Sequence, residues 1–282
     1  MPDLSEEESK VAQHYNEAAA MEEARLLQES PVEFGVTLRW LKRFAKRGDV
    51  VAEIGVGGGH YTEFLARAGC RLHLVDISLR LLDGVQERLK QQGLADHIVG
   101  YHHVSGTKLV GLPSDSVDLV LLMGPLYHLR ELPDRRRSVQ EAVRILKPGG
   151  MLFAAGINRL SYLRDLLRLK FGPASERVAF HQRYLRDGNL DPEHAPPIGD
   201  AHLTTAADFR TLFQDDFEEV AMVGVESFTS PIQDVFRALP VAEQEVWLDL
   251  VEATGQTPEG IGQSDHLLLV AKKKELKCQL QV

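Results

Sequence analysis

A glycine-rich turn between an apolar run and a helical pattern constrains this chain more than any other feature. Glu53-Ile54-Gly55-Val56-Gly57-Gly58-Gly59 ends the apolar run Val50–Ile54 and precedes the helical pattern Tyr61–Ala68. Glycines let the backbone turn tightly and approach a ligand with no Cβ in the way. The next apolar run ends at Asp76, 21 positions after Gly55, where a carboxylate can accept hydrogen bonds from both hydroxyls of a ribose. The pattern predicts a βαβ unit that binds a nucleoside-like ligand at the carboxyl ends of its strands.

Short apolar runs alternate with amphipathic helical patterns along the chain. The runs are Val50–Ile54, Arg71–Asp76, Ile98–Val104, Val117–Met123, Met151–Ala155, Val220–Val225 and His266–Ala271. Strands that alternate with helices pair in parallel and are buried on both faces. The sequence therefore predicts an α/β fold with a mostly parallel seven-stranded sheet and helices on both faces.

Other segments interrupt or precede this alternation. Lys10–Gln28 has a helical pattern, and Ser30-Pro31-Val32-Glu33 predicts the start of a second helix, with Ser30 as its cap and Glu33 at capping-box spacing. The alternation stops after Gly156 and resumes near residue 204. We expect an N-terminal helical cap (1–48), a cofactor-binding α/β core (49–156), an inserted substrate lid (157–203), the C-terminal part of the core (204–271) and a tail (272–282).

Net charge and cysteine content limit which binding partners, disulfides and metal sites the chain is expected to have. The chain of 282 residues has 32 Lys and Arg against 41 Asp and Glu, a formal net charge of −9. Nucleic acids and anionic membranes bind positive surfaces, so we expect no DNA partner and no membrane, and RNA is disfavoured. Cys70 and Cys278 are too few for a disulfide framework, and no histidine spacing resembles a metal motif. The absence of a signal-peptide pattern favours the cytoplasm; the oligomeric state stays open.

Two cofactor classes fit a glycine loop of this kind. A dinucleotide site has G-x-G-x-x-G, but His60 stands where the third glycine would be. Glu53 lies two residues before Gly55, and a carboxylate there repels a diphosphate but suits a ligand with a cationic amino-acid tail. A nicotinamide-dependent oxidoreductase is therefore the alternative from a different class of enzyme.

Several motifs in order resemble those of class I S-adenosylmethionine-dependent methyltransferases, which have a Rossmann-like fold. The segments that carry the resemblance are Val51–Gly59, Leu74–Asp76, Leu112–Val120 and Arg144–Gly150. The run Met123-Gly124-Pro125-Leu126-Tyr127-His128-Leu129 is similar to the G-P-L-Y-H-L of a bacterial subgroup. In that subgroup an N-terminal helical cap and an insertion after the fifth strand close over the site.

The resemblance implies S-adenosylmethionine as cofactor, with S-adenosylhomocysteine as product, and assigns binding residues. Glu53 and the backbone at Gly55, Gly57 and Gly59 would hold the methionine moiety. Asp76 would bind the ribose, and Ile77 would pack on the adenine. The loop that usually supplies an acidic adenine contact reads Val104-Ser105-Gly106-Thr107 and has no carboxylate, so Ser105, Gly106 and Thr107 are its candidates. Met123 and Gly124 would lie at the sulfonium.

The implied reaction is in-line transfer of a methyl group to oxygen or nitrogen of a small-molecule acceptor. His128 and Tyr127 follow the fourth strand, where acceptor and cofactor would meet, and they either act as a base and an orienting group or pack under the lid. Tyr15 could fold over the cofactor or pack in the core. Further candidate contacts, each also consistent with a purely structural role, are His60, His181, Arg183, His194 and His202. Alternatives are a methyltransferase for RNA or protein and a non-catalytic binding protein.

We expect the arginine run Arg135-Arg136-Arg137 to be a solvated helix edge.

Overall fold

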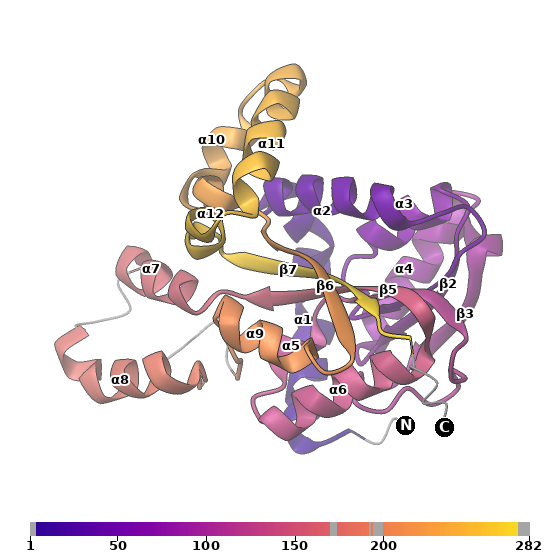
Figure 1. Cartoon of the computed structure of the whole chain (residues 1–282), viewed down its shortest axis with the longest axis horizontal. Coiled ribbons are helices and arrows are strands. Elements are labelled where there is room, and N and C mark those ends of the chain that lie inside the picture. The colour runs from indigo at the N-terminus through magenta and orange to yellow at the C-terminus, as the bar shows by residue number, and fades with distance from the viewer. Residues whose placement is uncertain (1–3, 170–173, 192, 194–199, 276–282) are drawn as a thin grey trace, which may run out of the picture.

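The computed structural model describes residues 4–169, 174–191, 193 and 200–275. Seven strands form one sheet in the order β3-β2-β1-β4-β5-β7-β6 (Figure 1). Their bounds are β1 Val50–Ile54, β2 Arg71–Asp76, β3 Ile98–His103, β4 Val117–Leu122, β5 Leu146–Ile157, β6 Phe217–Gly224 and β7 His266–Lys273. Strands β1 to β5 pair in parallel, and β7 is antiparallel to both β5 and β6. The predicted α/β fold and mostly parallel sheet are confirmed.

The strand order reverses between β1 and β4. The chain runs outward from β1 to β3 and then returns to β4, which pairs with the other side of β1. Loops that leave β1 and β4 therefore diverge to opposite sides and open a crevice at the carboxyl ends of these strands, the usual ligand position in such sheets.

Helices cover both faces of the sheet, because the central strands are apolar on both sides. Leu119 and Leu121 of β4 pack on one face, and Val120 and Leu122 pack on the other. The first face is covered by α2 (Pro31–Phe44), α3 (His60–Arg67), α4 (Leu79–Gln91) and part of α11 (Val241–Gly255). The second face is covered by α6 (Leu132–Ile145) and α9 (Ala206–Phe213).

The N-terminal helix α1 (Glu6–Gln28) starts earlier than the pattern of apolar residues predicts. The side chain of Ser5 accepts a hydrogen bond from the backbone N–H of Glu8, and the Glu8 carboxylate accepts one from Ser5 N–H. This reciprocal capping stabilises the polar first turn. The predicted helix start at Ser30 is confirmed, since α2 begins at Pro31, but the capping box is wrong. Ser30 makes no side-chain cap, and Glu33 pairs with Arg25 instead of the Ser30 N–H, which donates to the Arg25 carbonyl.

Strand β5 also begins before its predicted start at Met151. Val117 pairs with Leu146, whereas Leu119 pairs with Met151, so the register shifts across the intervening residues of β5. Gly149 absorbs this shift with φ +74°, a conformation that glycine adopts without strain. The Lys147–Gly150 turn thus ends α6 and already belongs to the strand.

The insertion after β5 has a small core of its own. Helices α7 (Arg159–Leu169) and α8 (Val178–Asp187) project beyond the end of β5 in Figure 1. The buried residues of this core are Phe180, Tyr184, Leu190, Ala201 and Leu203. The described part of the insertion is therefore packed around a core of its own.

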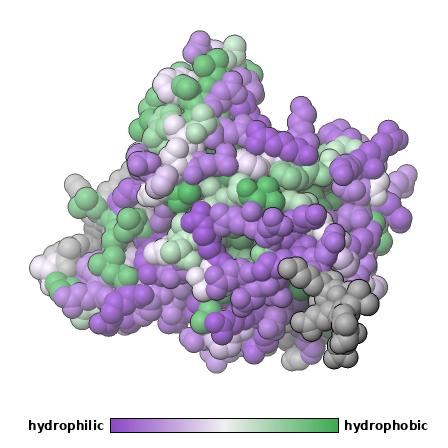
Figure 2. All heavy atoms as spheres, viewed as in Figure 1, coloured by the Kyte–Doolittle hydropathy of each residue, from purple (hydrophilic) through white to green (hydrophobic). Residues whose placement is uncertain are grey.

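The remaining short elements lie between the longer helices and the strands. They are α5 (Pro125–His128), α10 (Gln233–Arg237), α12 (Pro258–Gln263) and the 3₁₀ turns Ala95–His97, Ala174–Arg177 and Ser227–Ile232. Figure 2 shows apolar side chains among polar ones over the projecting α10–α11 region, where Val241 is 74% exposed. Among the described helices, none is long and apolar enough to cross a membrane.

Candidate active site

A pocket lies at the carboxyl ends of β1, β2 and β4, where the strand order reverses. It encloses about 670 Å³ of free space, part of it open to solvent, within the usual range for small-molecule sites. The predicted site residues that line it are Gly55, Gly57, Asp76, Ile77, Ser105, Gly106, Met123, Gly124, Tyr127 and His128. Loops after four different strands bring these residues together, because parallel strands end at one edge of the sheet.

The glycine loop adopts backbone conformations that other residues rarely reach. Gly55, Gly57 and Gly59 have φ values of +83°, +51° and +70°. A Cβ on Gly55 would lie 3.0 Å from Cδ of Pro125, in the loop after β4. Gly59 instead caps α3, and a Cβ there would lie 2.7 Å from Val85 of α4. Gly59 does not line the pocket; it allows α4 to pack against the loop.

We expect Gly55→Ala to lower the free energy of unfolding by about 1–3 kcal/mol, because alanine must adopt a left-handed backbone and push against Pro125. Gly84→Ala is the matched control, since Gly84 lies inside α4 with open space around its Cβ position, and alanine there should stabilise the helix. Urea denaturation of both variants measures the difference. Equal stability of Gly55→Ala and the wild type would contradict the close approach of the two loops.

Asp76 joins the end of β2 to the glycine loop. Its Oδ1 accepts a hydrogen bond from Ser78 N–H at 2.8 Å, and its Oδ2 accepts one from Gly57 N–H at 3.3 Å. Burial raises the pKa of Asp76 to about 6, although these N–H groups oppose the rise. The carboxyl group is therefore mainly ionised at neutral pH and borders the pocket.

Glu53 does not line the pocket, unlike the expectation for it. Its side chain is fully buried below the loop, where Oε2 accepts a hydrogen bond from Thr62 Oγ1 at 2.5 Å and Oε1 has no partner among the described residues. Burial raises the pKa of Glu53 to about 8. Because the carboxyl group is then mostly neutral at pH 7, the structure does not support the predicted electrostatic contact with a cationic tail. Thr107 also lies outside the lining; it hydrogen-bonds to Ser105.

Helix α1 covers the pocket with residues that the sequence reasoning mostly missed. Glu8, Val11, Tyr15 and Glu22 line it from this side. Glu8 accepts a hydrogen bond from Ser105 Oγ. The Glu22 carboxylate lies over the glycine loop, where Oε1 is 3.1 Å from the position of a Cβ on Gly57. The acidic residues of a polar helix were a weak signal, because only the tertiary packing of α1 brings them to the loops.

Tyr15 and His128 meet across the pocket, so Tyr15 faces the site. The Tyr15 hydroxyl and His128 Nε2 are hydrogen-bonded at 2.7 Å, while His128 Nδ1 is buried and has no partner among the described residues. Burial lowers the pKa of His128 to about 4, helped by the nearby His14. The imidazole is therefore neutral at physiological pH. The hydroxyl of Tyr127 is buried beside it, and burial raises the pKa of Tyr127 above its ordinary value.

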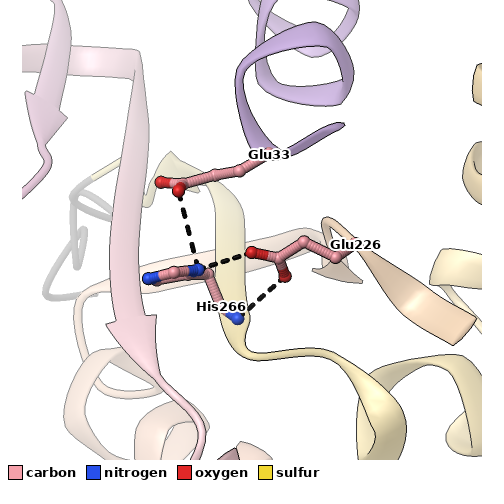
Figure 3. A group of neighbouring side chains, drawn as sticks. All are labelled: Glu33, Glu226 and His266. Carbon is pink, nitrogen blue, oxygen red and sulfur yellow. Dashed lines mark hydrogen bonds and ion pairs between the residues drawn. The ribbon is translucent and has the colours of Figure 1, made fainter. Parts of the chain in front are cut away.

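Figure 3 shows a second polar cluster at the same edge of the sheet, built by Glu33, Glu226 and His266. His266 Nδ1 lies 2.5 Å from Glu226 Oε1 and 3.5 Å from Glu33 Oε2, and Arg25 pairs with Glu33 at 3.1 Å. Burial opposes a charge on His266, but the two carboxylates outweigh it and raise the pKa of His266 to about 9. Two carboxylates thus face two cations, which balances the charge and leaves little attraction for a metal ion.

The cluster predicts a pH-dependent stability. Since the pKa of folded His266 lies above the unfolded value of about 6.5, its contribution is fully present below about pH 6.5 and is lost as pH rises through about 9. We expect the free energy of unfolding to fall over that window in the wild type and less in His266→Gln. Urea denaturation across the window measures both slopes; parallel slopes would show that His266 is not the titrating group. His97→Gln, which changes a histidine outside the cluster, is the control.

Of the other predicted histidine and arginine contacts, those among the described residues lie outside the pocket. His60 hydrogen-bonds to the carbonyl of Glu23 at 2.6 Å. Arg183 of α8 pairs with Asp191, and His181 lies on the same helix. His194, like Cys278, lies outside the described residues. No described residue of the insertion lines the pocket, whereas four residues of α1 do.

Comparisons with known proteins agree with this geometry. Residues 52–154 match the family model described as "Methyltransferase domain". The chain belongs to the class I S-adenosylmethionine-dependent methyltransferases, so it is an enzyme of that class and not a nicotinamide-dependent oxidoreductase. Its cofactor is S-adenosylmethionine, which fits a pocket with a glycine cradle and a carboxylate at the end of β2.

Particular relatives share the core to different extents. The chain is 31% identical over 177 residues to the "Ubiquinone biosynthesis O-methyltransferase" of Methylococcus capsulatus, covering 56% of this chain and 72% of that one. A protein of the same name from Aromatoleum aromaticum is 32% identical over 123 residues, 43% of this chain and 50% of its own, so the chain spans about half its length. The N-methyltransferase NodS from Bradyrhizobium japonicum, solved with S-adenosylhomocysteine, shares the fold with a TM-score of 0.55, 18% identity and coverage of 93% and 100%.

Proposed function

We propose that the protein transfers the methyl group to an oxygen atom of a small-molecule acceptor that binds beside His128. The observation that carries this proposal is the buried Nδ1 of His128, which has no partner among the described residues, in a pocket that α1 covers. A neutral imidazole with a free acceptor site can take the proton of a hydroxyl group. The O-methyltransferase name of the Methylococcus and Aromatoleum relatives supports oxygen over nitrogen.

The cofactor would lie along the carboxyl-end edge of β1, β2 and β4. The backbone at Gly55 and Gly57 would hold its amino-acid end, Asp76 would accept hydrogen bonds from its ribose, and Ile77 would pack on its adenine. Met123 and Gly124 would border the sulfonium. All of these residues line the pocket, which supports the assignment.

Two carboxylates of α1 complete this assignment. The loop after β3 has no acidic residue for the adenine end, but Glu8 reaches Ser105 in that loop from α1. Glu53 is buried and mostly neutral, whereas Glu22 lies over Gly57 and borders the pocket. Glu8, together with Ser105 and Gly106, would therefore bind the adenine. Glu22 would attract the ammonium group of the amino-acid tail.

Methyl transfer to a hydroxyl group needs the acceptor aligned with the methyl group and a residue that takes up the hydroxyl proton. When bound, the cofactor supplies a methyl group on a positively charged sulfur, which is already activated for displacement. While the acceptor oxygen took the methyl group and the sulfur kept the electrons of the broken bond, the hydroxyl proton would pass to His128 Nδ1. Nε2–H then donates to the Tyr15 oxygen, which holds the ring in place. Alignment of the reacting groups in a closed site can lower the activation free energy by roughly 7–11 kcal/mol.

Incubation with methyl-labelled S-adenosylmethionine and a matched panel of phenols, aliphatic alcohols and amines tests the proposal. We expect labelled methyl ethers from hydroxyl acceptors and no labelled products from the corresponding amines. Transfer to amines alone would overturn the choice of oxygen. Screening a small-metabolite extract for the gain of one labelled methyl group would then identify the acceptor.

A further inference from the structure

A second cavity borders α5 and encloses about 900 Å³ of free space, part of it open to solvent. Tyr127 of α5 lines both this cavity and the cofactor pocket, and its neighbour Leu126 lines this cavity, so α5 is a common wall. The rest of the lining comes from α6, the insertion, the end of β5 and α9. The backbone N–H of His202, in the insertion, donates to the Tyr127 carbonyl at 2.8 Å. The insertion therefore contributes to this cavity although its described residues do not line the cofactor pocket.

Positive charge is concentrated in this cavity. Four arginines line it, namely Arg135, Arg136, Arg159 and Arg186, against two aspartates, Asp187 and Asp208. The whole chain has a formal net charge of −9, so a cavity with more cations than anions is unusual for this protein. Arg135 and Arg159 are each only 8% exposed, which contradicts the solvated edge expected for Arg135.

The buried guanidinium of Arg135 lacks a carboxylate partner among the described residues. It donates to the carbonyl oxygens of Leu129 and Arg130 at 2.7 and 2.5 Å, whereas Arg159 pairs with Asp208 at 2.9 Å. Burial, together with the charge of Arg159, lowers the pKa of Arg135 to about 10, although Glu131 opposes this. A buried cation whose guanidinium pairs with no carboxylate is costly, and an anion in the cavity would relieve that cost.

The same positive charge affects the pKa of the neighbouring His202. Burial first, and then Arg135 and Arg159, lower the pKa of His202 to about 3, so it is neutral at physiological pH. At the cavity, Arg136 and Arg186 are exposed and have no ion-pair or hydrogen-bond partner for their side chains among the described residues. Arg137, one position further along α6, instead pairs with Asp134 and does not line the cavity.

We propose that this cavity binds a carboxylate or phosphate group, with Arg135 and Arg159 at its buried end and Arg136 and Arg186 reaching it from the exposed side. Guanidinium groups present paired donors that match both anions. The anion is either an acidic group of the methyl acceptor, in which case the assignment rests on the proposed function, or a separate small ligand. Both sources share the same recognition chemistry.

Binding of inorganic phosphate and of benzoate, measured by calorimetry against sodium chloride at equal ionic strength, tests the site. We expect saturable binding to the wild type that is weakened about tenfold or more in Arg136→Ala and in Arg186→Ala, since each loses a charge-assisted hydrogen bond. Arg137→Ala is the matched control on the same helix and should bind as the wild type does. Absence of saturable binding to the wild type, or equal weakening in Arg137→Ala, would overturn the proposal.

Arg135→Met tests the buried end of the site without relying on affinity alone. We expect phosphate to raise its Tm less than that of the wild type, because methionine offers no donor to an anion. A phosphate shift equal to that of the wild type would contradict the role of Arg135. Affinity for S-adenosylhomocysteine should be unchanged in all four variants, which separates this site from the cofactor pocket.

Kinetics with the acceptor found in the methylation assay distinguishes the two sources. If the anion belongs to the acceptor, phosphate competes with it, and Arg136→Ala raises KM for an acidic acceptor but not for its amide. If the anion is a separate ligand, phosphate binds equally well at saturating acceptor. Failure of the methylation assay would remove the proposed function but leave the direct binding of phosphate to the arginines as a result in itself.

Discussion

Replacing His128 with glutamine is expected to lower kcat about 10²–10⁴-fold, the usual contribution of a positioned base. The Kd for S-adenosylhomocysteine should stay close to that of the wild type, because His128 would act on the acceptor. Glutamine can keep a hydrogen bond to Tyr15 but cannot take up the proton of a hydroxyl group. Single-turnover methylation together with calorimetric binding separates the two effects.

Two companion variants sharpen this test. Tyr15→Phe removes only the hydroxyl that holds Nε2, so kcat should fall by less than in His128→Gln. His97→Gln changes a histidine that hydrogen-bonds to the Cys70 carbonyl outside the pocket, and should turn over normally. If His128→Gln methylates as fast as the wild type, His128 is a packing residue and the main observation in favour of O-methylation is lost.

Replacing Asp76 with alanine is expected to raise the Kd for S-adenosylhomocysteine about 10–150-fold, equivalent to one charge-assisted hydrogen bond of about 1.5–3 kcal/mol. The variant also frees Gly57 N–H and Ser78 N–H, which Asp76 holds. Asp76→Asn, which keeps one oxygen acceptor and the side-chain shape, should lose less affinity than Asp76→Ala. Asp83→Asn on the exposed face of α4 is the control and should bind normally.

The pH dependence of binding checks the same carboxylate. The pKa of Asp76 is raised to about 6 by burial, and only the ionised group can accept hydrogen bonds with both oxygens. Affinity of the wild type should therefore fall as pH decreases through about 6, and that of Asp76→Asn should change little. A wild-type Kd that is equal at about pH 5 and pH 8 would assign the ribose to another group.

The sheet was predictable because its signals are local. An apolar run identifies a buried strand, and strands that alternate with helices determine the parallel pairing. The glycine loop, Asp76 and the residues after β4 were predictable as neighbours for a related reason: parallel strands end at one edge. The contacts of α1 were not predictable from the sequence, because the position of Glu8 over Ser105 depends on how the whole helix packs. For Glu53 the prediction of a charged contact failed for another reason. A glutamate in water is ionised at neutral pH, but in the fold burial raises its pKa and favours the neutral form.

The histidine at position 266 and the glutamates around it were missed for a similar reason. Glu33 was interpreted through its spacing from Ser30, a local rule, while its partners Glu226 and His266 are about two hundred positions away along the chain. No spacing signal connects such distant residues. The lid was predicted over the pocket because an insertion follows the fifth strand, but the described part of that insertion packs beside α5 and α9 instead.

The hydrogen bond between Tyr15 and His128 makes the imidazole's orientation conditional on where α1 sits. A nucleoside that enters from the side of α1 would require that helix to move, and the imidazole would then lose the hydroxyl that holds it. In the proposed reaction, covering the pocket and orienting the base would therefore depend on the same helix. With α1 displaced, the enzyme would hold its cofactor but would transfer the methyl group slowly until the helix returned.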